Sequence, residues 1–176
     1  GLDPVSDMNP ILLKPEGPRG RQAIVDGLSR GTMSARDYFA YRRGLAPQVE
    51  AAYRRLARTH DIVLIEGAGS PAEVNLQRDD IVNMGMARMV DSPVLLVGDI
   101  DPGGVFAQLA GTVALVPQED RRRIRGLIIN KFRGDVSILR PGLAPLEELC
   151  GAPVLGVAPY ARIDIDDEDS SSPRLL

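Results

Sequence analysis

The chain is poor in several residue types on which other classes of protein depend. It has a single cysteine, Cys150, so no disulfide can form within the chain. No apolar run approaches the roughly 20 residues that a membrane-spanning helix needs, and no signal peptide opens the sequence. The net charge of −3 argues against bulk binding to nucleic acid. These features predict a cytoplasmic protein that binds neither a membrane nor nucleic acid.

Lysine is scarce as well, and its scarcity excludes one kind of nucleotide site from these residues. Of the 21 Lys and Arg residues, only Lys14 and Lys131 are lysines. A P-loop needs a lysine followed by Ser or Thr, after a glycine, to surround a phosphate group. Pro15 follows Lys14 and Phe132 follows Lys131, so the sequence contains no such loop.

A glutamine-hydrolysing site is also missing, because such a site needs a reactive cysteine with a histidine base. Cys150 falls on the apolar face of a predicted helix, which favours packing in the core. His60 stands at the end of another predicted helix, where a solvated cation at the C-terminus is the simpler interpretation.

What the sequence does contain is an alternation of helical and strand patterns. The apolar fraction of 44% in 176 residues suits one compact domain with a core. The first twenty residues are rich in Pro and Gly and are predicted to be irregular, and a short strand and a helix capped by Ser34 follow at 22–26 and 34–41. Four apolar runs without alternation predict strands covered on both faces, separated by amphipathic helices. This order predicts an α/β fold with a mostly parallel sheet flanked by helices, its strands at 61–65, 93–97, 126–129 and 153–157 and its helices at 45–56, 79–90, 105–113 and 143–150.

Ligands of an open parallel sheet bind beyond the carboxyl ends of its strands, so the residues after each predicted strand are the candidates for a site. After the first strand come Glu66 and the segment Gly67–Ser70. A carboxylate followed by a Gly-rich turn fits a Mg²⁺-phosphate site, because glycines let backbone N–H groups approach an anion. The alternative is a tight turn with an incidental glutamate.

Polar side chains also follow the next two strands. Asp99 and Asp101 precede a helix, where they would hold a metal or cap the helix. Asn130 offers an amide donor and acceptor for a purine edge, and Lys131 is one of the two lysines. A polar loop without a ligand is the alternative for this segment.

Seven segments, taken in order along the chain, resemble the cobyric acid synthase family. The resemblance extends from about Asp7 to Ser170. Its segments are 8–15 (MNPILLKP), 33–38 (MSARDY), 66–76 (EGAGSPAEVNL), 80–87 (DIVNMGMA), 99–101 (DID), 103–107 (GGVFA) and 129–135 (INKFRGD).

The resemblance implies an amide ligase of cobalamin biosynthesis that uses ATP, Mg²⁺ and glutamine. The reaction would amidate side-chain carboxylates of a corrinoid substrate, adenosylcobyrinic acid a,c-diamide, to give cobyric acid. Glu66 would be the catalytic residue and would bind Mg²⁺ together with Asp99. Asn130, Lys131 and Pro159 would bind the nucleotide, and the substrate or its phosphate would face Gly67, Ala68, Gly69, Ser70 and Asp101.

The resemblance further implies a dethiobiotin-synthetase-like member of the P-loop NTPases that lacks its first strand and its P-loop. Residues 1–163 would form part of the synthetase domain, and residues 164–176 an acidic linker towards an absent glutamine amidotransferase domain. The fragment alone is therefore expected to be inactive, and a homodimer is plausible for the family. Pro102 stands where the family is expected to have arginine. The alternatives are a non-catalytic corrinoid- or nucleotide-binding module and a related ligase such as cobyrinic acid a,c-diamide synthase.

Overall fold

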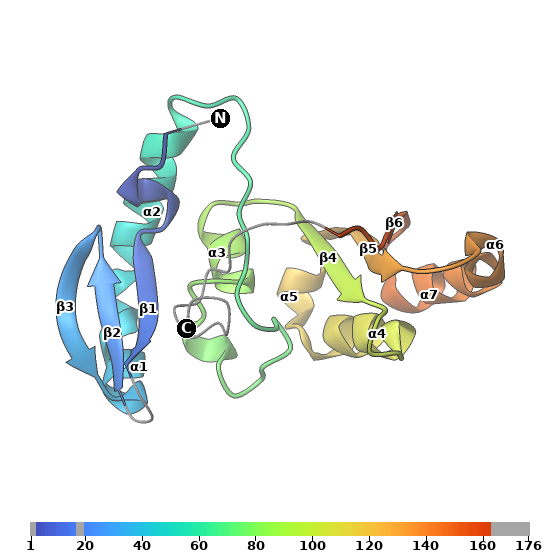
Figure 1. Cartoon of the computed structure of the whole chain (residues 1–176), viewed down its shortest axis with the longest axis horizontal. Helices are drawn as coiled ribbons and strands as arrows, with labels where there is room; N and C mark the ends of the chain where they lie inside the picture. Colours follow the sequence, from blue (N-terminus) through green and yellow to red (C-terminus); the bar gives the residue numbers. More distant parts are fainter. Residues whose placement is uncertain (1–2, 17–19, 163–176) are drawn as a thin grey trace. The chain divides into compact units, whose positions relative to one another are not determined.

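The computed structural model describes residues 3–16 and 20–162. These residues fall into two compact units, the first ending at Glu66 and the second beginning at Gly67. Each unit has its own sheet (Figure 1).

The sheet of the first unit is antiparallel, with its strands in the order in which they occur along the chain. Asp26 and Gly27 both have positive φ angles, 51° and 77°, which is the pattern of a tight Asp-Gly hairpin turn. The prediction that the first twenty residues are irregular is wrong, because residues 11–16 form a strand that pairs residue by residue with residues 20–25. The expected short strand at 22–26 is present. The strands are β1 (Ile11–Glu16), β2 (Gly20–Val25) and β3 (Leu28–Met33).

The helices of the first unit agree with the periodicity of the sequence. Ser34 caps the first α-helix, its Oγ accepting the backbone N–H of Asp37 at 3.2 Å. Val49 and Ala52 are buried on the second, and Glu50 and Arg54 form the expected ion pair at 2.5 Å. The helical segments are η1 (Ser6–Met8), α1 (Ala35–Arg42), η2 (Arg43–Leu45) and α2 (Ala46–Ala57).

Residues 61–65, which the sequence predicts to be a strand, form an irregular segment (Figure 1). Ile62 and Leu64 are 78% and 92% exposed. A strand exists only where its backbone N–H and C=O groups pair with a neighbour. Within the described ranges no strand pairs with this segment, so its β-branched composition alone does not order it.

The second unit contains a parallel sheet, which confirms the predicted α/β class and three of its four predicted strands. The strand order is β4-β5-β6. The strands are β4 (Val94–Asp99), β5 (Ile124–Phe132) and β6 (Val154–Pro159). Around them lie η3 (Gln77–Asp79), α3 (Met84–Met89), α4 (Val105–Leu115), α5 (Gln118–Arg121), α6 (Val136–Leu139), η4 (Arg140–Gly142) and α7 (Leu143–Cys150).

One face of this sheet carries the core. The predicted stripe of α4 is buried and packs with the fully buried Leu127 and Ile129 of β5. Gly98 allows the close approach of α4, since a Cβ there would lie 2.8 Å from a methyl carbon of Val105. Cys150 packs against this core, as the sequence predicts, and burial raises the pKa of its thiol. The buried stripe consists of Val105, Leu109 and Val113.

Helix α3 is shorter than the predicted helix over 79–90. The carboxylate of Asp80 accepts the backbone N–H groups of Val82, Asn83 and Gly85 at 2.8–2.9 Å. A carboxylate that accepts these hydrogen bonds lies ahead of the helix, whose N-cap residue is Asn83, and not within its first turn. The helix therefore begins at Met84.

None of the helices in the described parts combines the length and the apolar character that crossing a membrane requires.

Candidate functional site

The carboxyl ends of the three parallel strands bring four of the predicted site residues to one edge of the second unit. Asp99 ends β4, and its partner in the register of β5 is Asn130. Lys131 follows Asn130, and Pro159 at the end of β6 is in register with Phe132. This is the edge at which a parallel sheet binds its ligands.

Asp99 has both carboxylate oxygens occupied. Its Oδ2 accepts a hydrogen bond from Nζ of Lys131 at 2.5 Å, and its Oδ1 accepts the backbone N–H of Asp101 at 2.9 Å. These hydrogen bonds, that of Lys131 first, lower the pKa of Asp99 below its ordinary value of 3.8. Asp99 is therefore an anion at neutral pH, and its charge is balanced by the lysine.

The conformation of Lys131 is unusual for a residue with a side chain. Its φ angle is 61°, in the left-handed region. The side-chain Oδ1 of Asn130 accepts the backbone N–H of Lys131 at 2.9 Å, which holds the turn. Among the described residues, the amide nitrogen of Asn130 donates no hydrogen bond, so it remains a donor for a ligand.

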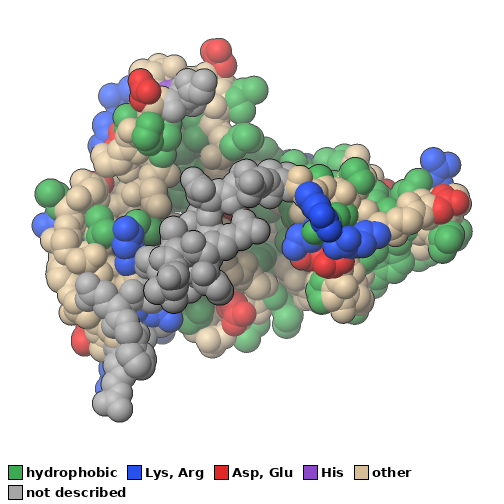
Figure 2. Space-filling view, viewed as in Figure 1, with side chains coloured by type: hydrophobic (Ala, Val, Ile, Leu, Met, Phe, Trp, Pro, Cys, Tyr) green, Lys and Arg blue, Asp and Glu red, His purple; other side chains and the backbone are tan. Residues whose placement is uncertain are grey.

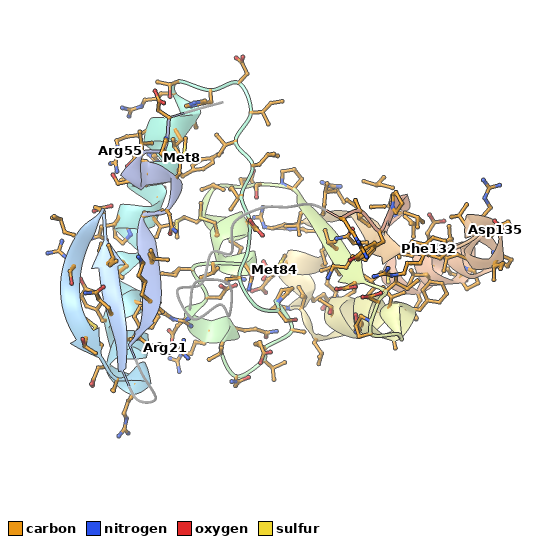
Figure 3. The ribbon with its side chains drawn as sticks, viewed as in Figure 1. Met8, Arg21, Arg55, Met84, Phe132 and Asp135 are labelled. Carbon is orange, nitrogen blue, oxygen red and sulfur yellow. The ribbon has the colours of Figure 1, made fainter. Side chains whose placement is uncertain are left out.

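Two residues that sequence reasoning left without a role complete the group. The Nε of Arg133 donates to Oδ1 of Asp101 at 3.1 Å, and the Cζ of Arg133 lies 3.4 Å from the centroid of the Tyr160 ring. The backbone N–H of Tyr160 donates to the carbonyl of Phe132 at 2.8 Å, which ties the end of β6 to the end of β5. Figure 3 labels Phe132 and Asp135, which stand on either side of the short loop formed by residues 133–134. The only signal in the sequence was position, since both residues lie within four residues of the end of a predicted strand.

The glycine-rich segment Gly67–Ser70 is held by Asn83, just before α3. The side-chain Nδ2 of Asn83 donates to the carbonyl of Ala68 at 2.9 Å. A Cβ at Gly67 would lie 2.1 Å from Oδ1 of Asn83, so only glycine fits there. Gly69 has a φ angle of 66°, which also favours glycine. Asn83 is therefore a positioning residue for this segment, and sequence reasoning did not identify it as one.

Comparison with known proteins now gives the family. Residues 32–166 match the family of the AAA domain. The chain belongs to this family. The match includes every predicted site residue from Glu66 to Pro159.

Curated relatives extend the comparison over the whole chain and confirm the predicted resemblance. The chain is 57% identical to a cobyric acid synthase of Lachnoclostridium phytofermentans, with 100% of the chain and 35% of that protein covered. It is 55% identical to the cobyric acid synthases of Ruminiclostridium cellulolyticum and Alkaliphilus metalliredigens, covering 99% of the chain and 34% and 35% of those proteins. The chain thus spans about a third of the length of these relatives. No solved structure matches it.

The predicted metal ligands belong to different units. Glu66 is exposed and ends the first unit, whereas Asp99 belongs to the second. Within residues 3–16 and 20–162, no three His, Cys, Asp or Glu side chains gather as a metal cluster. One or two carboxylates with the phosphates of a substrate are how Mg²⁺ is usually held, so this donor set fits a metal that arrives with a nucleotide and not an all-protein cage. The joint binding of Mg²⁺ by Glu66 and Asp99 stays a prediction.

Proposed function

We propose that the chain is the nucleotide-binding synthetase segment of an enzyme that makes cobyric acid in cobalamin biosynthesis. The observation that carries the proposal is the identity of 52–57% with cobyric acid synthases, which extends over nearly the whole chain. The group formed by Asp99, Asn130 and Lys131 supports it, because the polar groups lie where a parallel sheet binds a nucleotide.

The proposed reaction proceeds in two steps. A side-chain carboxylate of adenosylcobyrinic acid a,c-diamide attacks the γ-phosphorus of ATP, which gives an acyl phosphate and releases ADP. Ammonia derived from glutamine then attacks the acyl carbon, the C–O bond to phosphate breaks, and an amide and inorganic phosphate result. A bound Mg²⁺ would neutralise charge on the transferred phosphoryl group.

The residues of the chain have distinct proposed roles in these steps. The free amide nitrogen of Asn130 donates to the base, beside Pro159. Lys131 transfers its hydrogen bond from Asp99 to a phosphate oxygen, which leaves Asp99 available to the metal. Glu66 is the second metal ligand, and the backbone of Gly67–Ser70 faces the substrate or its phosphate.

Turnover is proposed to need more than these 176 residues. The sequence contains no lysine followed by Ser or Thr after a glycine, and therefore no P-loop. Without the backbone N–H groups and the lysine of a P-loop, the transferred phosphoryl group loses most of its electrostatic stabilisation. A further domain in the complete gene product would supply ammonia. The 176-residue chain alone is expected to show no ATP hydrolysis above background.

The test uses the complete gene product with adenosylcobyrinic acid a,c-diamide, Mg²⁺-ATP and glutamine. Mass spectrometry of the corrinoid should show carboxylates converted to amides, with ADP and glutamate formed in step. Glu66→Gln should abolish this turnover without unfolding the protein, whereas Glu119→Gln, an exposed control on α5, should leave it unchanged. A complete protein that binds ATP and corrinoid without amidating the corrinoid would contradict the proposal.

A further inference from the structure

The guanidinium of Arg133 is held on one edge and one face. Its Nε donates to Oδ1 of Asp101 at 3.1 Å, and its Cζ lies 3.4 Å from the centroid of the Tyr160 ring. A carbon-to-centroid distance this short is the contact of one planar group lying on another, well inside the roughly 6 Å of a cation–π interaction. The side chain of Arg133 is thus a plate with a fixed orientation.

More than half of the Arg133 side chain is accessible to solvent. The side chain of Arg133 is 55% exposed and that of Asp101 is 46% exposed. Tyr160, on the other side of the plate, is 40% exposed. This exposure makes the guanidinium accessible to a further planar group.

The position of the plate connects it with the proposed nucleotide site. Arg133 comes three residues after Asn130, in the loop that leaves β5. Tyr160 comes directly after Pro159, and its backbone N–H is bonded to the carbonyl of Phe132. The plate therefore stands beside the two residues proposed to contact the base.

The charge of the group favours a base over a phosphate as the ligand. Asp101 balances the charge of Arg133. A neutralised guanidinium has little long-range attraction for an anion, whereas its flat face retains its capacity to stack on an aromatic ring. A purine base is a ligand of that kind.

We propose that Arg133, fixed by Tyr160 and Asp101, is the stacking platform for the purine base of the nucleotide. This inference rests on the proposed function, because it assumes that the carboxyl edge of the sheet binds ATP. Stacking recognises the π-face that every base has, so Arg133 contributes affinity for the base, and the choice between adenine and guanine belongs to Asn130.

The test is equilibrium binding to the complete gene product with three probes, ATP, adenosine and inorganic tripolyphosphate. Arg133→Ala should weaken ATP and adenosine by the same factor, about tenfold, which is typical of the loss of one stacking contact. Tripolyphosphate should bind as tightly as before. Arg133→Lys should resemble Arg133→Ala, because a lysine keeps the charge and lacks the plane.

The contribution of the Tyr160 ring to the orientation of Arg133 is tested by a matched pair of substitutions. Tyr160→Phe retains the ring and should bind like the wild type, whereas Tyr160→Leu should lose part of the affinity for adenosine. Arg125→Ala, at the other end of β5 and also exposed, is the control and should change nothing.

Three outcomes would overturn the inference. A loss of ATP and tripolyphosphate binding with adenosine unchanged would make Arg133 a phosphate ligand. If Arg133→Ala binds all three probes like the wild type, with an unchanged melting temperature, then Arg133 does not contact the base, and its contacts with Tyr160 and Asp101 are only surface contacts. If the wild type binds neither ATP nor adenosine, the proposed function itself fails, and the platform fails with it.

Discussion

At the end of β4, the ion pair between Asp99 and Lys131 sets the protonation of the proposed site. Because the hydrogen bond from Lys131 lowers the pKa of Asp99, its carboxyl carbon should titrate by NMR with a midpoint below 3.8. The folded pKa is the lower one, so the stability that the pair contributes is complete above the unfolded value. It is lost as the pH falls through the folded pKa of Asp99.

Replacing the lysine tests this cause directly. In Lys131→Met the midpoint of Asp99 should rise towards 3.8 and remain slightly below it, since the backbone N–H of Asp101 still donates. Arg125→Met, at the other end of β5, should leave the midpoint unchanged. A midpoint that does not move in Lys131→Met would contradict the assignment of the shift to the lysine.

Asn130 should govern the choice between nucleotides and contribute little else. Its Oδ1 is engaged by the backbone of Lys131, so the free amide nitrogen is the group that a base would contact. Asn130→Ala should raise the KM for ATP and bring the ratio of kcat/KM for ATP and GTP towards unity, measured in the complete gene product. An unchanged ratio would speak against contact with the base.

At the residue scale, the sequence predicts those positions that depend on strand ends. Asp99, Asn130 and Pro159 were placed at one edge because the ends of parallel strands coincide there. The stack of Arg133 on Tyr160 could not be predicted, because it depends on how far two side chains reach between separate loops. The distance between these two side chains cannot be deduced from their positions in the sequence.

At the scale of elements, two glycines in the β4–α4 unit should respond in opposite directions to alanine. A Cβ at Gly98 would lie 2.8–2.9 Å from Val105 and Leu109, both buried, so Gly98→Ala should cost about 1–3 kcal/mol of unfolding free energy. Gly111 stands within α4, where an added methyl group would meet no atom within 4 Å, so Gly111→Ala should stabilise by about 0.5–1 kcal/mol. Urea titrations of the two variants measure both changes. Equal destabilisation by both would contradict the proposed packing of α4 against β4.

The elements that the sequence predicts correctly are those with strong local signals. The periodicity of α4 and the glycine after α7 depend on neighbours a few residues away, and Gly151 has the expected left-handed φ of 65°. The prediction of a strand at 61–65 was wrong because a strand forms only by pairing with another strand, which is distant in sequence and is not encoded in the segment itself. The start of α3 was misplaced because an acidic residue is favourable both in a first turn and just ahead of a helix. The three backbone hydrogen bonds that Asp80 accepts place it ahead of the N-cap residue Asn83.

At the scale of the molecule, the described residues cover only one face of the parallel sheet. The sequence predicts strands buried on both faces, yet Leu95, Val97 and Leu155 are each more than half exposed on the face opposite the core. Figure 2 shows further apolar side chains at the surface over α6 and α7, where Ile138 and Leu149 are exposed. The described residues therefore pack a core against one face of the sheet and leave apolar side chains exposed on the other.

The stability of the second unit should depend most on the ion pair whose carboxylate is buried. Asp120 is fully buried and accepts a hydrogen bond from Arg88, whereas Asp91, paired with Arg123 at 2.6 Å, has a side chain that is 91% exposed. Asp120→Asn places a neutral amide in this buried position and leaves Arg88, which is 37% exposed, without its anionic partner, so it should lower the unfolding free energy by about 1–3 kcal/mol.

The matched substitution isolates burial as the cause. Asp91→Asn removes the same charge from a carboxylate that is 91% exposed, although its partner Arg123 is only 15% exposed, and should cost about 1 kcal/mol or less, because water screens the exposed carboxylate. Asparagine also tolerates the positive φ of 53° at this position, so the backbone adds no strain of its own. Urea titrations, combined with hydrogen exchange of the amides of β4, β5 and β6, measure both variants. Similar costs for the two substitutions would mean that burial of Asp120 does not make its pair with Arg88 a determinant of the stability of this unit.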